Sequence, residues 1–223
     1  MTVDLFDAIR AGDRAEVEHL LLLDPGLIHS RERGLSPVLT AAYQLEMQLA
    51  DFLADKTVVI NIFEAAALGR TTHLVRLLAR HPELVNACAD DGFQPLGLAS
   101  FFGHLEAAEY LVMAGASVNV PSNNELHAVP VQLSVVGGHA SIVKMLLKNG
   151  AQPNVRARGG LTPLHSAAAN GDVESIQLLI LAGADLHVLN DDGKLPLDLA
   201  REGGHSQVVE ILKREITKRF CAV

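Results

Sequence analysis

Proline recurs through the second half of the chain at a nearly constant interval. Pro95, Pro130, Pro163 and Pro196 are separated by 35, 33 and 33 residues, and a glycine follows each proline eight positions later. Proline is favoured in the first turn of a helix, and glycine ends a helix in the left-handed conformation. Each interval therefore predicts a short helix of about two turns, repeated along the chain.

A second amphipathic segment follows each of these glycines. In residues 141–148 apolar side chains recur at helical spacing, and Asn149-Gly150-Ala151 ends the segment. One such helix pair cannot bury its own apolar face, so consecutive pairs have to stack to form a common core. We therefore expect an all-α solenoid, in which turns project between one helix pair and the next.

One unit carries a recognisable motif. Leu161-Thr162-Pro163-Leu164-His165-Ser166-Ala167 resembles the T-P-L-H-x-A signature of ankyrin repeats. The resemblance implies an all-α ankyrin-repeat solenoid, in which helix-turn-helix units are joined by β-turn or hairpin fingers. It extends over nearly the whole chain as about seven repeats. Their inner helices are expected to begin near Asp4, Pro37, Asn61, Pro95, Pro130, Pro163 and Pro196.

The second repeat is shorter than the others. Pro37 and Asn61 are only 24 residues apart, so this repeat is expected to lack the finger between Asp55 and Ile60. Residues 62–69 and 101–104 look similar to stand-alone bacterial ankyrin-repeat proteins. We expect a single ankyrin-repeat domain over residues 1–223. Its units are 1–33 (N-terminal capping repeat), 34–57 (the shortened repeat), 58–91, 92–126, 127–159, 160–192 and 193–223 (C-terminal capping repeat).

Charge and composition narrow the partners and the compartment. The chain has 26 acidic and 18 basic residues, a net charge of −8, whereas proteins that bind nucleic acid need clustered Lys and Arg. No apolar stretch is long enough to span a bilayer, and residues 1–7 lack the features of a signal peptide. Two cysteines, Cys88 and Cys221, favour a reducing compartment. We therefore expect a cytoplasmic protein, monomeric rather than oligomeric, without nucleic-acid or membrane partners.

The sequence offers no catalytic constellation. It contains no C-x-x-C, H-E-x-x-H, G-x-S-x-G or P-loop motif, so we expect no enzyme activity, no cofactor and no metal. His104, His139 and His205 recur after the repeat glycine, and stacking could align them as a ladder of metal ligands. We favour the alternative, in which they form hydrogen bonds at helix termini. The resemblance implies a similar structural role for His165, which bonds neighbouring backbone.

The resemblance also implies where a partner binds. In ankyrin-repeat proteins the fingers and inner helices line a concave face, and positions beside the finger glycine and the inner-helix glycine are exposed there. Exposed apolar clusters tend to mark binding sites, and aromatic residues are enriched among interface hot spots. We therefore expect a hydrophobic groove for a protein partner. Its centre is Phe93, Phe101 and Phe102; its flanks are Tyr43, Leu68, Val136 and Leu161; and Arg156 and Arg158, beside the acidic Asp185, Asp191 and Asp192, form a charged rim.

Two questions stay open from the sequence. The Phe side chains could instead pack against the next repeat, because a Phe on an inner helix is more often core than contact. The function we favour is a non-enzymatic protein–protein interaction module for an unidentified protein on the concave face. The alternatives are a regulatory or inhibitory subunit of an unidentified enzyme, and a His-based metal-binding protein.

Overall fold

Helices and loops alternate along the computed structural model, which describes residues 4–221, with side chains up to residue 218. Within these residues there are fourteen α-helices and no β-strand, so the predicted all-α repeat architecture is confirmed. No described helix combines the length and the apolar character needed to cross a membrane. The helix pairs are α1 (Leu5–Arg10) and α2 (Arg14–Leu23), α3 (Pro37–Tyr43) and α4 (Met47–Lys56), α5 (Ile62–Ala67) and α6 (Thr71–Arg80), α7 (Pro95–Phe102) and α8 (Leu105–Met113), α9 (Pro130–Val136) and α10 (Ala140–Lys148), α11 (Pro163–Asn170) and α12 (Val173–Leu181), and α13 (Pro196–Glu202) and α14 (Ser206–Cys221), with 3-10 turns η1 (Pro25–His29), η2 (Pro82–Asn86) and η3 (Arg158–Gly160).

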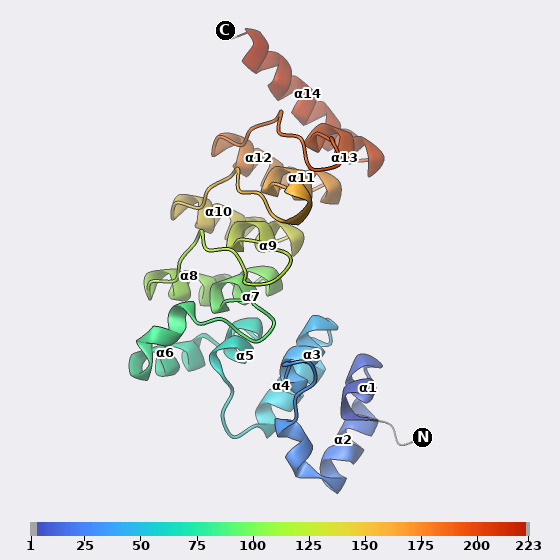
Figure 1. The fold of residues 1–223 in the computed structure, drawn as a ribbon, viewed down its shortest axis with the longest axis vertical. Helices are drawn as coiled ribbons and strands as arrows, with labels where there is room; N and C mark the ends of the chain where they lie inside the picture. The colour runs from blue at the N-terminus through green and yellow to red at the C-terminus, as the bar shows by residue number, and fades with distance from the viewer. Residues whose placement is uncertain (1–3, 222–223) are drawn as a thin grey trace.

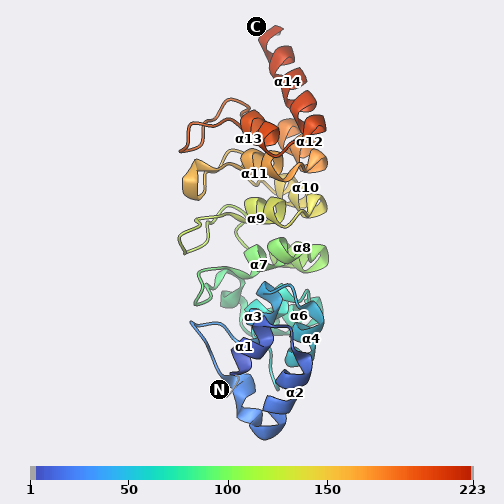
Figure 2. The same cartoon turned by 90° about the vertical axis from the view of Figure 1, so that its right-hand side faces the viewer.

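The helix pairs stack along one axis, from α1 and α2 at one end to α13 and α14 at the other (Figure 1). In each pair the first helix is the inner one and the second is the outer one. Figure 2 shows that long loops project beyond the inner helices, on the side away from the outer helices. We name each loop, or finger, by the inner helix that follows it: the α3 finger (residues 30–36), the α7 finger (87–94), the α9 finger (114–129), the α11 finger (149–162) and the α13 finger (182–195).

The core is a continuous layer of small and aliphatic side chains between consecutive pairs. Ala65, Ala66 and Ala67 of α5 are completely buried, and so are Leu111 of α8 and Leu146 of α10. Small side chains let neighbouring inner helices approach closely, and α7 packs on α9 as α11 packs on α13. The apolar face of each pair is therefore buried by its neighbours, as a solenoid requires.

The glycine that ends an inner helix is required both by the backbone and by the next repeat. Gly103 has a φ of 85° and Gly171 a φ of 70°, both in the left-handed region. A Cβ atom on Gly103 would also lie only 2.4 Å from Cε1 of His139. The close approach lets Nε2 of His139 donate to the carbonyl oxygen of Phe101 at 3.0 Å. One glycine thus ends a helix and admits a side chain that joins two repeats.

The second repeat breaks this rule. Leu45 lies eight residues after Pro37, where the other repeats have glycine, and it adopts a φ of 62° although it carries a side chain. Leu45 is also 72% exposed, so contacts with neighbouring residues do little to offset the cost of this conformation. A non-glycine residue in the left-handed region costs on the order of 1–3 kcal/mol. The end of α3 therefore holds local strain.

As predicted, the second repeat lacks a finger, and residues 57–61 join α4 directly to α5. Its loss brings the flanking fingers together. A Cβ atom on Gly34 of the α3 finger would lie 2.6 Å from Cβ of Asp90 in the α7 finger. Gly92 approaches Asn123 of the next finger in the same way, with a Cβ-to-oxygen distance of 2.4 Å. The α3 finger therefore stacks directly on the α7 finger, and the row of fingers stays continuous although one repeat has none.

The strain at the end of α3 gives a stability prediction. Replacing Leu45 with glycine is expected to raise the free energy of unfolding by about 1 kcal/mol, because glycine adopts a positive φ without steric cost. Urea denaturation measures the change. The control is Gln44→Gly, because Gln44 is an exposed neighbour with a φ of −80°. This variant is expected to be less stable than the wild type, because glycine there only raises the conformational entropy of the unfolded chain. Equal stability of Leu45→Gly and the wild type would contradict the strain.

Candidate functional site

A groove on the concave face runs across three repeats. The α7, α9 and α11 fingers form one wall, and the inner helices α7, α9 and α11 form the floor. Its volume of about 380 Å³ lies in the range of roughly 300–1,000 Å³ that is typical of binding pockets. Its lining is almost wholly apolar. The groove is therefore shaped to bury apolar groups from another molecule.

Most of the residues predicted from the sequence line this groove. Phe93 and Leu161 reach it from the fingers, Phe101 and Val136 from the ends of α7 and α9, and Tyr43 from α3. Val136 is 50% exposed. Phe101 is half-buried, but it is not among the side chains that pack against the core. The structure thus brings these five side chains together around one cavity, and their role in binding stays a prediction.

Three of the predicted residues do not line the groove: the apolar Leu68 and Phe102, and the arginine Arg156. Leu68, after the last turn of α5, is buried in the core with 9% of its surface exposed. Phe102 is half-buried and packs against the core. Its ring centroid lies 5.6 Å from that of Tyr43 and 5.0 Å from that of Phe101. Tyr43, at the end of α3, therefore contacts Phe102 of α7, whereas Leu68 belongs to the core.

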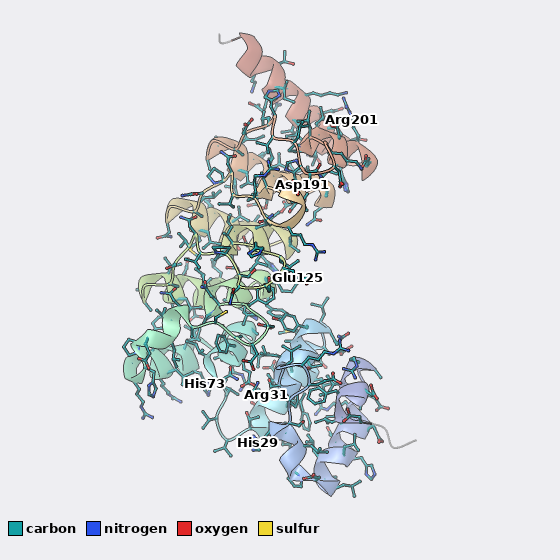
Figure 3. All side chains as sticks on the ribbon, in the orientation of Figure 1. His29, Arg31, His73, Glu125, Asp191 and Arg201 are labelled. Carbon is teal, nitrogen blue, oxygen red and sulfur yellow. The ribbon has the colours of Figure 1, made fainter. Side chains whose placement is uncertain are left out.

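The two predicted rim arginines behave differently. Both were expected beside the acidic residues of the α13 finger. Arg156 does lie there, with its guanidinium 3.3 Å from the Asp191 carboxylate, but it does not line the groove. Arg158 turns the other way and pairs with Glu125 of the α9 finger at 2.9 Å. Arg158 thus lines the groove and links two of its fingers (Glu125 and Asp191 are labelled in Figure 3).

The α9 finger contributes groove residues that the sequence analysis missed. The interval from Pro95 to Pro130 is 35 residues, two longer than the other intervals, and the extra length lies in this finger. There Leu126 is 45% exposed and lines the groove, and its carbonyl accepts a hydrogen bond from the N–H of Arg158 at 2.9 Å. The unequal interval was the signal for this wall. The remaining missed lining residues are Gly97, Leu98, Ala128, Gln132, Leu133, Ala157 and Ser166.

Backbone hydrogen bonds fix the fingers to one another. The N–H of Asn123 donates to the Gly92 carbonyl at 2.8 Å, and the N–H of Asp191 donates to the Gly159 carbonyl at 2.9 Å. With the bond between Arg158 and Leu126, the fingers from α7 to α13 form a continuous series. A wall held in this way needs little ordering when a partner binds, which favours affinity.

Tyr43 closes one end of the groove. Its hydroxyl donates to the Asp91 carboxylate at 2.6 Å, and the other carboxylate oxygen accepts the N–H of Phe93 at 3.1 Å. Burial, together with the hydrogen bond to Asp91, raises the pKa of the Tyr43 hydroxyl well above its usual value. Tyr43 therefore stays neutral and ties the second repeat to the α7 finger.

Four histidines, at positions 104, 139, 165 and 205, form hydrogen bonds with backbone carbonyl oxygens. Each of the four uses Nε2 to donate to a carbonyl of an adjacent repeat, which confirms the predicted structural role at helix termini. No group of three or more His, Cys, Asp or Glu side chains able to hold a metal occurs among the described residues. Cys88 is exposed, and the side chain of Cys221 lies outside the described ones. The bonds join His104 to Ala67 (2.8 Å), His139 to Phe101 (3.0 Å), His165 to Lys194 (3.1 Å) and His205 to Ala169 (2.8 Å).

Buried histidines make the stability depend on pH. Burial lowers the pKa of His104 and of His165 below the usual value, so the unfolded chain takes up protons at a higher pH than the folded one. The free energy of unfolding is therefore expected to fall as the pH drops below about 6.5, the pKa of an unperturbed histidine. Urea denaturation between about pH 7.5 and pH 5.5 measures this loss.

A natural control for the pH effect exists in the chain. Gln132 occupies the position of His165 in the preceding repeat, and its Nε2 donates to the Leu161 carbonyl at 2.9 Å, as His165 does to Lys194. His165→Gln should keep this hydrogen bond but not titrate. Its loss of stability over the same pH interval is expected to be smaller than that of the wild type. Identical losses would contradict a contribution from His165.

The two adjacent phenylalanines should respond differently to truncation. Complete burial makes a Phe→Ala substitution cost about 3–5 kcal/mol. Because Phe102 packs against the core and Phe101 faces the groove, we expect Phe102→Ala to cost roughly 2 kcal/mol and Phe101→Ala less than about 1 kcal/mol. Urea denaturation of the two single variants tests the difference. Equal and large losses would place both rings in the core.

Comparison with known proteins agrees with this architecture. The family described as "Ankyrin repeats (3 copies)" matches residues 130–219, and the family described as "Ankyrin repeat" matches residues 91–123. The matched residues include α7 to α13, the part of the chain that builds most of the groove. The first 90 residues, with the shortened repeat, lie outside both matches.

Individual relatives are similar over about half of this chain. Cyclin-dependent kinase inhibitor 2A of Homo sapiens is 38% identical over 119 residues, which are 53% of this chain and 74% of that protein. Cyclin-dependent kinase 4 inhibitor B of Rattus norvegicus is 36% identical over 118 residues, 52% of this chain and 88% of that protein. Tyrosine-protein kinase Shark of Drosophila melanogaster is 34% identical over 125 residues, but these are only 13% of its length. All three are animal proteins, so they do not support the narrower likeness to bacterial proteins. The chain belongs to the ankyrin-repeat family.

Proposed function

We propose that this protein is a non-catalytic regulator that binds a protein kinase in its concave groove and inhibits it. Two relatives are named as inhibitors of cyclin-dependent kinases, and the similarity covers 74% and 88% of their lengths. This supports the inhibitory-subunit interpretation over an interaction module of unspecified purpose. The apolar groove is the structural observation that carries the proposal, because it offers a surface on which such a partner can bind.

The chemistry of the groove suits recognition rather than catalysis. Among the described residues that line it there is no His, Cys, Asp, Glu or Lys. Three of its polar side chains already have partners: Tyr43 bonds Asp91, Arg158 pairs with Glu125, and Nε2 of Gln132 donates to the Leu161 carbonyl. A partner that places one large apolar side chain there gains about 1.5–3 kcal/mol from burial. Two such side chains supply a strong anchor.

Rigid presentation is the mechanism that follows from this geometry. The finger wall is hydrogen-bonded along its length, and the floor is formed by helices packed in the core. A surface of this kind binds with little backbone change and pays little conformational entropy. A kinase bound there would have part of its surface covered by this rigid repeat stack. Inhibition then results from occupation of that surface and needs no chemical step.

Titration calorimetry with cyclin-dependent kinase 4 tests the proposal. Wild-type protein is expected to bind, and the double variant Leu126→Asp, Val136→Asp is expected to bind at least about tenfold more weakly, because carboxylates in the apolar groove lose hydration on binding. Leu126 and Val136 are 45% and 50% exposed, so the variant should still fold.

A matched control places the same change on the opposite face. Met113 and Leu181 end the outer helices α8 and α12, and each is 84% exposed. The double variant Met113→Asp, Leu181→Asp is expected to bind the kinase like the wild type. If both double variants bind equally well, the groove is not the site. If the wild type does not bind, the kinase is not the partner.

A further inference from the structure

The row of apolar side chains along the finger wall is interrupted at its centre. Two positions before the inner-helix proline, the α7 finger carries Phe93 and the α11 finger carries Leu161. The α9 finger, which is hydrogen-bonded to both of these fingers, carries Ala128 at the same position. All three residues line the groove. The wall therefore lacks a large side chain at Ala128, where both neighbouring fingers have one.

Three aromatic side chains line the same groove. They are Tyr43, Phe93 and Phe101, and the ring centroids of Tyr43 and Phe93 lie 6.4 Å apart with a tilted arrangement. Aromatic rings attract one another in edge-to-face and offset geometries. An apolar cavity of roughly 150 Å³ is already large enough to bind benzene, and the groove has a volume of about 380 Å³. A ring from another molecule therefore has both the room and the neighbours that it needs.

The lining offers no unpaired charge to an occupant. Arg158 is the one charged side chain among the described residues that line the groove, and it pairs with Glu125 at 2.9 Å. The Tyr43 hydroxyl is bound to Asp91, Nε2 of Gln132 is bound to a backbone carbonyl, and Oε1 of Gln132 is buried. A charged group placed there would lose its hydration without gaining a partner. The occupant that matches this lining is uncharged and apolar.

From the gap at Ala128, the aromatic lining and the absence of unpaired charge, we propose that the groove receives the ring of a phenylalanine from the partner. The ring fills the space beside Ala128, between Phe93 and Leu161. The proposal rests on the proposed function and specifies the residue type by which the kinase is bound. A single aromatic side chain in an apolar pocket is the kind of anchor that dominates many interfaces.

NMR titration of the labelled wild type with three uncharged compounds tests the proposal. They are the N-acetyl amides of phenylalanine, cyclohexylalanine and serine. The phenylalanine compound is expected to shift the amide signals of Phe93, Ala128 and Leu161, with a Kd on the order of 1 mM. The cyclohexylalanine compound has no aromatic ring and should bind at least about threefold more weakly, and the serine compound should not bind. Added salt should leave these affinities unchanged, because none of the compounds is charged.

Filling the gap from within the protein tests its location. Ala128→Leu supplies the side chain that Leu161 has at the same position of the next finger. This variant is expected to bind the phenylalanine compound at least about tenfold more weakly than the wild type. The control is Ala169→Leu, which makes the same substitution at an exposed position of α11 outside the groove lining and should bind like the wild type. Urea denaturation shows whether both variants fold, and the wild-type titrations decide the proposal if Ala128→Leu does not.

The outcomes separate this inference from the proposed function. Equal binding of the phenylalanine and cyclohexylalanine compounds, or equal binding by Ala128→Leu and the wild type, overturns the inference while kinase binding in the calorimeter can still hold. Binding of the phenylalanine compound without any binding of the kinase keeps the aromatic pocket and rejects the kinase. A wild-type dimer that Ala128→Leu dissociates would show that the ring comes from a second copy, which also overturns the inference.

Discussion

Asparagine side chains that reach from one repeat to the backbone of the next hold this stack in register. Nδ2 of Asn119 donates to the Gly150 carbonyl at 2.9 Å, while its Oδ1 accepts the N–H of Gln152 at 2.9 Å. Asn86 and Asn154 make the same two bonds with the repeats that follow them. Apolar packing is non-directional, but two bonds from one amide fix both distance and rotation. The positions of the α9, α11 and α13 fingers, and with them part of the groove wall, depend on these bonds.

The shortened repeat has to be joined by other means. There the side chain of Arg70 pairs with Asp51 and Asp55 on α4, and Tyr43 bonds Asp91 of the α7 finger. Aromatic contacts add to this, since the centroid of the Tyr43 ring lies 6.4 Å from that of Phe93 and 5.6 Å from that of Phe102. The aromatic side chains that the sequence singled out thus have two duties. Some join the shortened repeat to the α7 repeat, and others line the groove that begins beside it.

This double duty explains how much the sequence could predict. The period, the helix pairs and four groove residues (Phe93, Phe101, Val136 and Leu161) follow from local rules, because a regular repeat gives each position the same neighbours. Leu68 lies in the core, and Phe102 contacts Tyr43 of the irregular repeat, so a rule for regular repeats does not give the surroundings of Phe102. The direction of Arg158 depends on Glu125, which lies in the two-residue extension of the α9 finger. Where the length of the repeat changes, the position of a residue in the repeat no longer predicts which residues surround its side chain.

The repeat that contributes most to the groove is also the one with an incomplete motif. In the signature repeat, the Thr162 hydroxyl lies 2.8 Å from Nδ1 of His165. In the preceding repeat Val129 and Gln132 take these places, and Oε1 of Gln132 is buried without a hydrogen-bond partner among the described residues. An unpaired buried acceptor costs about 1–3 kcal/mol. Departures from a local rule tend to be kept where function needs them. This departure lies in the floor of the groove. It therefore supports the proposal that the groove binds the partner, independently of the shape of the groove.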